Sequence, residues 1–473
     1  MTKLVGKEDW VKAEFLGISL GDKRLNKRAV TIASSLSKNP KGTIPEVCKK
    51  WADIKGAYCF FSNKKVTQKK ILAPHVISTL GRARLEKVVL AIQDTSSLNF
   101  NNLLKTENLG EIGDSRARGL ICHSSYLVND EGDPLGLLDQ EFWARKTSEF
   151  KDPEKRTETD IKKKESYKWQ KSLQKTHKLT ESLDQTHVIS IADREADIFT
   201  FYEEAKLMEE SFIIRLKHNR RVDKKSRASN DGDRLFASLE NSKPIDTVEL
   251  EINDRSAPNR KRTAKLELRA KEMEFNAPRA KSMTKHNFRL EKISLTVISV
   301  REIKSEDKAP IHWVLVTNVE INSPEQILYC AKCYSHRWAI EVFHRILKTG
   351  CRVESIRFDD ADKIKTYATF ASILAWHIHW LTYLARKFPE NEPTQLLDEE
   401  DQELLRTAVE KQEKKPKKRG RKKKLKVKDC ILYIAKLGGF IGRKNDGFPG
   451  PEVIWRGLVR FLEMKHFLQT LQQ

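Results

Sequence analysis

The sequence lacks the features of a membrane or secreted protein. No stretch approaches the roughly 18 consecutive apolar residues that a spanning helix needs, and the first ten residues contain no apolar signal region. Cysteine is scarce, with seven residues in a chain of 473, and this odd count predicts free thiols in a reducing compartment. We therefore expect a cytoplasmic protein that has no membrane partner.

Motifs for nucleotide chemistry and for a zinc ribbon are also missing. The phosphate-cradling pattern G-x-x-x-x-G-K-[ST] does not occur, so we expect no nucleotide cofactor. Cys330 and Cys333 form a C-x-x-C pair that could bind zinc or exchange thiols, but no second pair follows at ribbon spacing. A zinc site is therefore disfavoured, and the sequence leaves the role of this pair open.

Acidic residues are too few to balance the basic ones. The chain has 66 Asp and Glu against 89 Lys and Arg, a formal net charge of +23, and such an excess attracts phosphate whatever the nucleic-acid sequence. Residues 411–428 hold 12 Lys or Arg and one Glu, which leaves +12 on the rest of the chain. We expect this run to be a basic loop that contacts DNA non-specifically.

Two short apolar segments each lead to an aspartate. The run 87–92 has the length and β-branched content of a strand and predicts a strand that ends at Asp94, before small polar turn residues. The run 188–192 predicts a second strand that ends at Asp193, followed by a helix start with acids in its first turn. For each Asp alone, a helix cap or turn is the alternative.

A third candidate region carries four chemically unusual positions. Tyr334, Arg337, Glu341 and Lys348 read Y-x2-R-x3-E-x6-K, and at 100° per residue they would share one face of an α-helix, within about 60° of arc. A phenol, two cations and a carboxylate on one face suit the binding of a phosphate and a metal. The alternative is an ordinary surface ion pair between Arg337 and Glu341, worth a few tenths of a kcal/mol.

These segments carry a family resemblance. The motifs are A-I-x-D-T-[ST]-S-L at 91–98, D-R-E-A-D-I at 193–198 and Y-x-H-R-W-x-I-E-x-F-H-x-x-x-K-T-G at 334–350. With them the chain resembles the bacterial cut-and-paste DDE transposases of the insertion-sequence-four group. The resemblance spans nearly the whole chain, because further blocks keep the family order at 21–24, 55–58, 164–169, 212–218 and 435–440.

The resemblance implies an α/β fold, an RNase H-like mixed sheet flanked by helices. Asp94 and Asp193 would lie on neighbouring strands, and Glu341 would lie on a helix packed beside them. This catalytic triad would bind two Mg²⁺ ions, for which Mn²⁺ could substitute, because hard carboxylate oxygens suit such ions. The implied reaction nicks the DNA, forms and opens a hairpin, and joins the freed 3′-OH to target DNA.

The resemblance also implies contacts to DNA. Tyr334, Arg337 and Lys348 would hold phosphates near the scissile bond. Further candidate DNA contacts are Arg215, Lys217, Arg24 and Arg28. Trp313 would receive a base flipped from the DNA end, although a core aromatic is the better interpretation of Trp313 from its sequence context alone. Relatives have basic residues where this chain has Cys59 and Ser62. The resemblance therefore does not indicate which terminal DNA sequence this chain recognises.

We expect three parts in the chain. Residues 1–70 would form a helical DNA-end-recognition domain, residues 71–375 the catalytic domain, and residues 376–473 a helical dimerisation region that contains the basic loop. Apolar bursts at 247–252, 264–268, 293–300 and 311–319 predict a β-rich insertion at about 220–320. The expected partners are double-stranded DNA, as terminal inverted repeats and target, and a second copy of the chain in a synaptic complex at the nucleoid.

Two other functions remain open from the sequence. An RNase H-like endonuclease or resolvase would use the same acids without joining strands, and a catalytically silent relic would bind DNA ends without cutting. The presence of Asp94, Asp193 and Glu341 argues against a silent relic. The predicted face of Tyr334, Arg337, Glu341 and Lys348 argues against a plain nuclease, because hydrolysis alone requires less.

Overall fold

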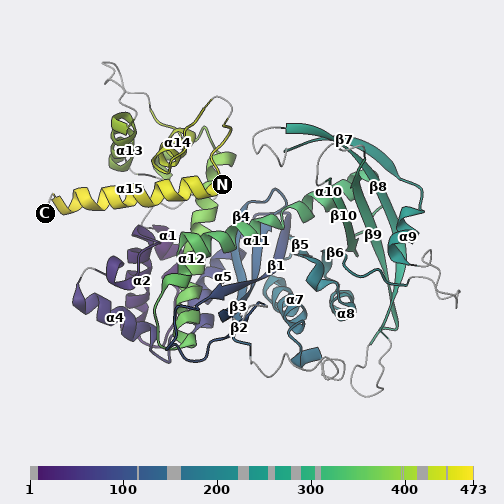
Figure 1. The fold of residues 1–473 in the computed structure, drawn as a ribbon, viewed down its shortest axis with the longest axis horizontal. Helices are drawn as coiled ribbons and strands as arrows, with labels where there is room; N and C mark the ends of the chain where they lie inside the picture. Colours follow the sequence, from purple (N-terminus) through teal and green to yellow (C-terminus); the bar gives the residue numbers. More distant parts are fainter. Residues whose placement is uncertain are drawn as a thin grey trace.

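The computed structural model describes most of the chain as helices around one long mixed sheet (Figure 1). It describes residues 9–48, 50–113, 117–145, 161–221, 234–253, 261–278, 289–303, 310–395, 397, 399–412, 424–443 and 446–471. Most of the basic run predicted at 411–428 lies outside the described residues. No helix in the described part of the chain is long and apolar enough to cross a membrane.

Runs of helices at both ends of the described chain flank a middle part that contains all of the described strands. The helices are α1 (Asp9–Phe15), α2 (Lys23–Lys38), α3 (Ile44–Val47), α4 (Trp51–Phe61), α5 (Gln68–Ala83), α7 (Tyr167–Thr180), α8 (Phe199–Leu207), α9 (Leu235–Glu240), α10 (Pro324–Ser335), α11 (Trp338–Arg345), α12 (Ala361–Lys387), α13 (Glu399–Gln412), α14 (Val427–Leu437) and α15 (Pro451–Leu471). The strands are β1 (Val88–Asn99), β2 (Gly110–Ile112), β3 (Ala117–Asn129), β4 (Pro134–Trp143), β5 (His187–Ala192), β6 (Ser211–Arg215), β7 (Asp246–Asn253), β8 (Lys261–Asn276), β9 (Lys292–Glu302) and β10 (His312–Thr317).

The sheet is mixed, as the predicted α/β fold class requires. Among the described residues its strand order is β2-β3-β1-β5-β6-β10-β9-β8-β7, and β4 also pairs with β3, along residues 121–128. The three strands β1, β5 and β6 are parallel, whereas β3 and β10 run antiparallel to their neighbours. The fold-class prediction is confirmed, and each apolar burst predicted between 247 and 319 lies in or overlaps one of the strands β7–β10.

One strand runs further than the sequence predicts. The strand that carries Asp94 does not end there but continues to Asn99. Thr95 pairs with His123, and the ladder continues until Asn99 faces Gly119. The sequence predicts a turn at the small polar residues 95–97, but the long neighbouring strand β3 supplies their hydrogen-bond partners. Such pairing outweighs the weak turn preference of these residues. Asp94 therefore lies within the sheet and not at its rim.

The predicted helix through Tyr334 and Lys348 is interrupted. Helix α10 ends at Ser335, Arg337 caps α11, and a π-helical turn follows at Ile346–Gly350. The interruption is a short stretch of i→i−3 bonding, in which Ala339 N donates to His336 O at 2.8 Å. The ring of His336 lies 3.1 Å from the carbonyl oxygen of Asp130, so tertiary contact fixes the break. The prediction of one uninterrupted α-helix through these four residues is wrong.

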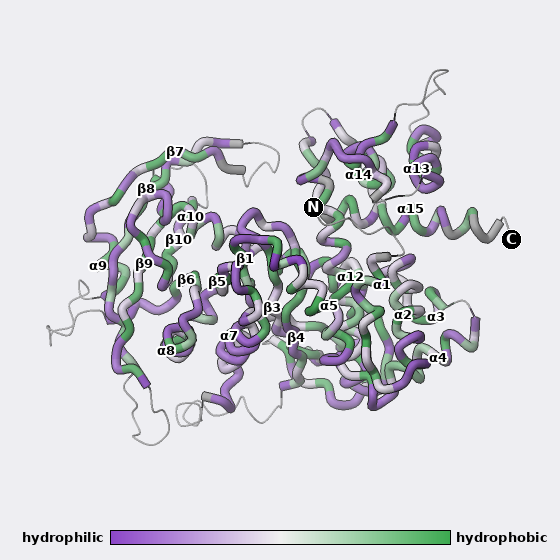
Figure 2. The backbone as a smooth tube through the Cα atoms, turned by 180° about the vertical axis from the view of Figure 1, so that it is seen from behind, coloured by the Kyte–Doolittle hydropathy of each residue, from purple (hydrophilic) through white to green (hydrophobic). Residues whose placement is uncertain are grey.

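Helix α12 is buried over much of its length and is contacted by α2, α4, α5, α11, α14 and α15. Helix α2 begins at the cap Asp22 and buries Ala29, Ile32, Ala33 and Leu36 at helical spacing. Trp10 of α1 stacks on His377 of α12 at 3.8 Å between ring centroids. Figure 2 shows hydrophobic segments gathered where α5 and α12 pass each other. The N-terminal helices are thereby packed against one end of the sheet (Figure 1).

Candidate active site

The parallel pair β1 and β5 brings two aspartates to one place. Ile92 of β1 pairs with Ile191 of β5, so Asp94 and Asp193 follow at equivalent positions two residues later. Asp193 is also a helix cap, since its Oδ1 accepts a 2.8 Å hydrogen bond from the backbone N–H of Glu195. The capping alternative is therefore true of Asp193, but it leaves the second carboxylate oxygen open to another partner.

The environment of Asp94 is electrostatically unusual. Burial and the carboxylates of Asp193 and Glu341 raise the pKa of Asp94 to about 6, against the opposing effects of the Thr95 backbone N–H and Arg337. Both of these carboxylates therefore lie near enough to Asp94 to act on its charge. A carboxyl group with such a raised pKa is typical of a functional site, because a structural acid is normally compensated.

Glu341 is held by a cation in this structure. Arg337 forms an ion pair with Glu341, four residues further along, so the alternative of an i,i+4 pair is also realised. Although burial lowers the pKa of Arg337, Tyr334 and Glu341 raise it overall. Arg337 also acts on Asp94. One guanidinium therefore compensates part of the charge of the acid cluster, and it lies within reach of any phosphate that approaches those acids.

Aromatic and basic side chains from β6, β10 and α10 lie next to the Asp193 side of the site. The buried ring of Tyr334 meets the ring of Trp313 edge to face, with centroids 5.5 Å apart. Burial raises the pKa of Tyr334, and Arg215 and Asp193 both lie close enough to act on it. The structure therefore brings Trp313 and Arg215 to the Asp193 side of the site, next to Tyr334.

Lys217 lies on a loop anchored by an acid that the sequence interpretation missed. Buried Asp197 Oδ2 accepts the backbone N–H of Lys217 at 2.7 Å, and its Oδ1 accepts the hydroxyl of Tyr202 at 2.6 Å. Asp197 also pairs with Arg220. The side chain of Lys217 is exposed. The second Asp of the D-R-E-A-D motif was the available signal, and its role in this structure is to hold the loop that follows β6.

A second residue that the sequence interpretation missed is His344, one turn beyond Glu341. Its Nδ1 lies 3.8 Å from Oδ2 of Asp94, and its Nε2 lies 3.3 Å from the hydroxyl of Ser124, the β3 partner of Asp94. Ser124 in turn accepts the side-chain amide of Gln140 at 3.2 Å. Burial and Lys348 lower the pKa of His344 to about 3, so a neutral imidazole backs the acid cluster. Its i+3 spacing from Glu341 was the available signal.

Arg24 and Arg28 lie apart from these acids, on α2. The side chain of Arg24 is 96% exposed. Arg28 pairs with Asp53 of α4 at 3.0 Å, and its guanidinium crosses α4 at Gly56, where a Cβ would approach it to 2.9 Å. A Cβ at this crossing would displace the flexible end of the Arg28 side chain. The two arginines belong to a separate basic surface on the N-terminal helices, so the structure does not bring them into the active site.

The acid cluster has the donor chemistry of a divalent-metal site. Asp94, Asp193 and Glu341 offer hard oxygen ligands, and burial, with a further contribution from the two other carboxylates, raises the pKa of Asp94. Within the described ranges, no three His, Cys, Asp or Glu side chains converge closely enough to hold an ion as they stand. The pairing of Glu341 with Arg337 explains part of this, because it draws one carboxylate toward a competing cation.

Three family models match the chain. Residues 7–66 match a transposase DNA-binding model, residues 144–377 a transposase DDE domain, and residues 373–469 a transposase Tn5 dimerisation domain. The DDE match includes Asp193 and Glu341 and begins after Asp94. It implies an RNase H-like fold and dependence on a divalent metal, and the flanking matches indicate DNA binding and homodimer formation. The chain therefore belongs to the DDE transposases of the insertion-sequence-four group, enzymes that cleave DNA and transfer its strands.

Proposed function

We propose that this transposase excises a DNA element and inserts it elsewhere by four phosphoryl transfers in one active site. A water oxygen first attacks a phosphorus at the element's end and leaves a free 3′-OH. That 3′-OH attacks the opposite strand, which forms a hairpin and releases the flanking DNA. Water then opens the hairpin, and the restored 3′-OH attacks target DNA. The supporting observation is that Asp94 and Asp193 follow equivalent positions of the paired strands β1 and β5, while Glu341 and its partner Arg337 both act on Asp94.

The triad residues Asp94, Asp193 and Glu341 would hold two Mg²⁺ ions, with Mn²⁺ as a substitute. When bound, such ions lower the pKa of the attacking oxygen and neutralise the leaving oxygen. Arg337, which pairs with Glu341 here, would change partner to a DNA phosphate and release that carboxylate. Neutral His344 would keep Asp94 oriented from behind, since it lies between Asp94 and Ser124.

The other predicted side chains would bind DNA. Tyr334, Lys348, Arg215 and Lys217 would contact backbone phosphates, and Trp313 would stack on a base flipped from the end. The partial exposure of Trp313 and its edge contact with Tyr334 are compatible with that role. Each of these assignments predicts a larger loss of strand cleavage than of protein stability on truncation to Ala.

The division of labour would follow the three predicted parts. Arg24 and Arg28 of residues 1–70 would recognise the terminal inverted repeats, residues 71–375 would perform the chemistry, and residues 376–473 would pair two subunits in a synaptic complex. Each subunit would cut the end held mainly by its partner. The reaction would take place on nucleoid DNA in the cytoplasm.

The test uses the purified protein with Mg²⁺ and a labelled duplex that carries the terminal repeats flanking its own coding sequence. Asp193→Ala is the matched inactive control. Nicks, hairpins and joined target products that vanish in the control are the expected result. Cuts without hairpins or joining would indicate an endonuclease, and binding without cuts would indicate a silent DNA-binding relic.

A further inference from the structure

A polar cleft of about 720 Å³ lies where three distant parts of the chain meet. Lys41 comes from the loop after α2, Asn99 and Asn101 come from the end of β1, and Lys348 and Arg352 come from the turns after α11. Helix α15 borders the same place, because its Trp455 ring lies 3.9 Å from Nζ of Lys41. The cleft therefore joins the region matched as DNA-binding to the catalytic helix.

The charge of the cleft is unbalanced. Lys41, Lys348 and Arg352 line it together with a single acid, Glu354, whose Oε1 accepts the backbone N–H of Asn99 at 2.7 Å. In the part of the chain that the structure describes, none of the three cations lies within 4.0 Å of a carboxylate oxygen. Three cations around a solvent-filled hollow create a strong local attraction for an anion.

Lys41 also has further positive side chains close to it. Burial and then Arg352 lower the pKa of Lys41, with further contributions from Arg456 and Arg460 of α15, against one raising effect from Glu463. The ammonium group is fixed over the Trp455 ring by a cation–π contact. Lys41 is therefore held in a positive environment that the protein alone does not neutralise.

The backbone at Arg352 provides an independent sign that this side chain has a use. Arg352 has φ 44° and ψ 40°, a left-handed conformation that favours glycine. Strain of this kind persists where surrounding structure or function requires it. A glycine would remove the strain, yet the chain places a cation there, at the lip of the cleft.

We propose that Lys41 and Arg352 form, in this cleft, a further binding site for a backbone phosphate of double-stranded DNA, next to Lys348, whose phosphate contact belongs to the proposed function. Asn99 and Asn101 would add neutral hydrogen bonds to the same strand. The inference rests on the proposed transposition activity, because the bound DNA is that enzyme's substrate. The phosphate would come either from the element's end or from the target, and the experiment below separates the two.

The experiment compares Lys41→Gln and Arg352→Gly with Lys206→Gln, an equal loss of one positive charge at an exposed position on α8. Binding to the terminal-repeat duplex and to an unrelated duplex is measured over a series of salt concentrations. Each cleft variant should weaken binding to one duplex roughly tenfold and reduce its salt slope by about 1. Lys206→Gln should change neither. Because Arg352→Gly relieves backbone strain, its melting temperature should not fall, so misfolding cannot explain a loss.

A duplex scanned with neutral methylphosphonates then locates the contact. Substitution at one phosphate should weaken DNA binding by the unmodified protein and leave DNA binding by Arg352→Gly unchanged. If the cleft variants lose affinity for the terminal-repeat duplex, the phosphate belongs to the element's end. If they lose only the ability of a preformed end complex to capture the unrelated duplex, the phosphate belongs to the target. Unchanged binding and salt slopes for both variants, while the unmodified protein still cleaves and joins, would overturn the proposal. A protein that never cleaves or joins would instead overturn the proposed function.

Discussion

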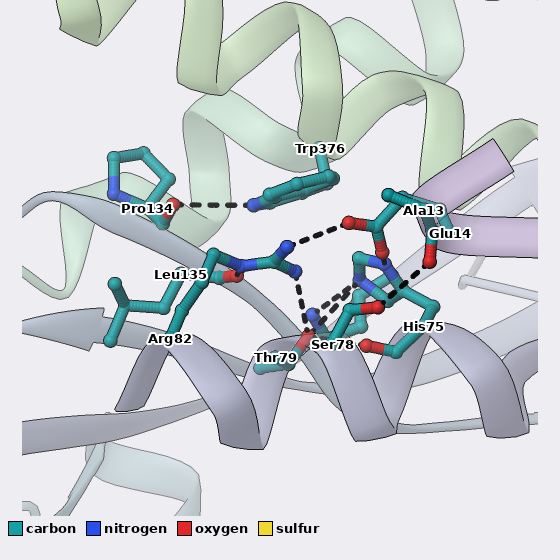
Figure 3. A network of polar contacts seen from close by, with 10 residues as sticks. Ala13, Glu14, His75, Ser78, Thr79, Arg82, Pro134, Leu135 and Trp376 are labelled. Carbon is teal, nitrogen blue, oxygen red and sulfur yellow. Dashed lines mark hydrogen bonds and ion pairs between the residues drawn. The ribbon is translucent and has the colours of Figure 1, made fainter. Parts of the chain in front are cut away.

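Two clusters of charged side chains differ in how their carboxylates are compensated. In the first, Glu14 is 2% exposed, accepts Nη1 of Arg82 at 2.6 Å and lies 2.5 Å from Nδ1 of His75 (Figure 3). Although burial alone would raise it, His75 and Arg82 lower the pKa of Glu14 to about 2. In the second cluster, burial and neighbouring acids raise the pKa of Asp94 to about 6.

The first cluster is closed. His75 Nε2 accepts the backbone N–H of Leu137 at 3.0 Å, so Nδ1 carries the proton that points to Glu14. Arg82 donates to the carbonyl of Leu135 at 2.6 Å and lies over the Trp376 ring at 4.2 Å. These contacts join α1, α5, β4 and α12. A closed cluster orients secondary structure, whereas the open cluster around Asp94 retains the capacity to bind a ligand.

The largest expected effect is on catalysis by the open cluster. Asp94→Asn should reduce DNA cleavage by about 10³-fold or more, because it removes a charged metal ligand. The free energy of unfolding should stay equal or rise, since a repelled buried charge is lost. Cleavage is measured on a denaturing gel and stability by urea unfolding, with Asp184→Asn, an exposed acid after α7, as the control. Cleavage within tenfold of normal would remove Asp94 from the triad.

The next effect is on stability through the closed cluster. Glu14→Ala should lower the free energy of unfolding by about 3 kcal/mol, because it leaves a partly buried guanidinium without its partner. The matched control is Glu131→Ala, which breaks an exposed pair with Lys332 and should cost less than about 1 kcal/mol. Equal losses in urea unfolding would show that burial does not distinguish the two pairs.

The two clusters should also have opposite pH signatures in the metal-free protein. The folded pKa of Glu14, about 2, is below its ordinary 4.5, so its stabilisation is complete above that ordinary value and is lost as the pH falls toward 2. The folded pKa of Asp94, about 6, is above its ordinary 3.8, so stability falls as the pH rises through this window.

Each contribution should be of the order of 3 kcal/mol. Unfolding is measured between these pH values in the presence of a chelator. Asp94→Asn should abolish the fall on the neutral side, and Glu14→Gln should abolish the loss on the acidic side. The comparison fails if either variant keeps the pH profile of the unmodified protein.

The smallest expected effect concerns the cation between the acids. Arg337→Ala removes the ion-pair partner of Glu341 and should strengthen Mn²⁺ binding without DNA by roughly tenfold, about 1.4 kcal/mol. The same variant should cleave DNA more slowly, because a phosphate contact is lost. Calorimetric titration measures the first effect and the gel assay the second. Weaker Mn²⁺ binding would mean that Arg337 organises the metal ligands instead of competing with the metal.

The sequence by itself determined those features that depend on residues near one another in the chain. The apolar runs before Asp94 and Asp193 predicted two strands, and the bursts between 247 and 319 predicted four more. The acids and the motif order indicated the transposase family, which the family models confirm. Such features are readable because strand propensity, periodicity and motif spacing are local properties.

Only the tertiary structure decided which residues pair across long stretches of chain. It extended β1 past Asp94 and interrupted the helix after Ser335. It also placed Glu14 against His75, 61 residues away, and assembled the cleft from Lys41 and Arg352. The pKa of Asp94 is likewise a product of burial and of acids from other elements. Compensation of a charge depends on packing and on distance in space, and no local pattern in a sequence carries that information.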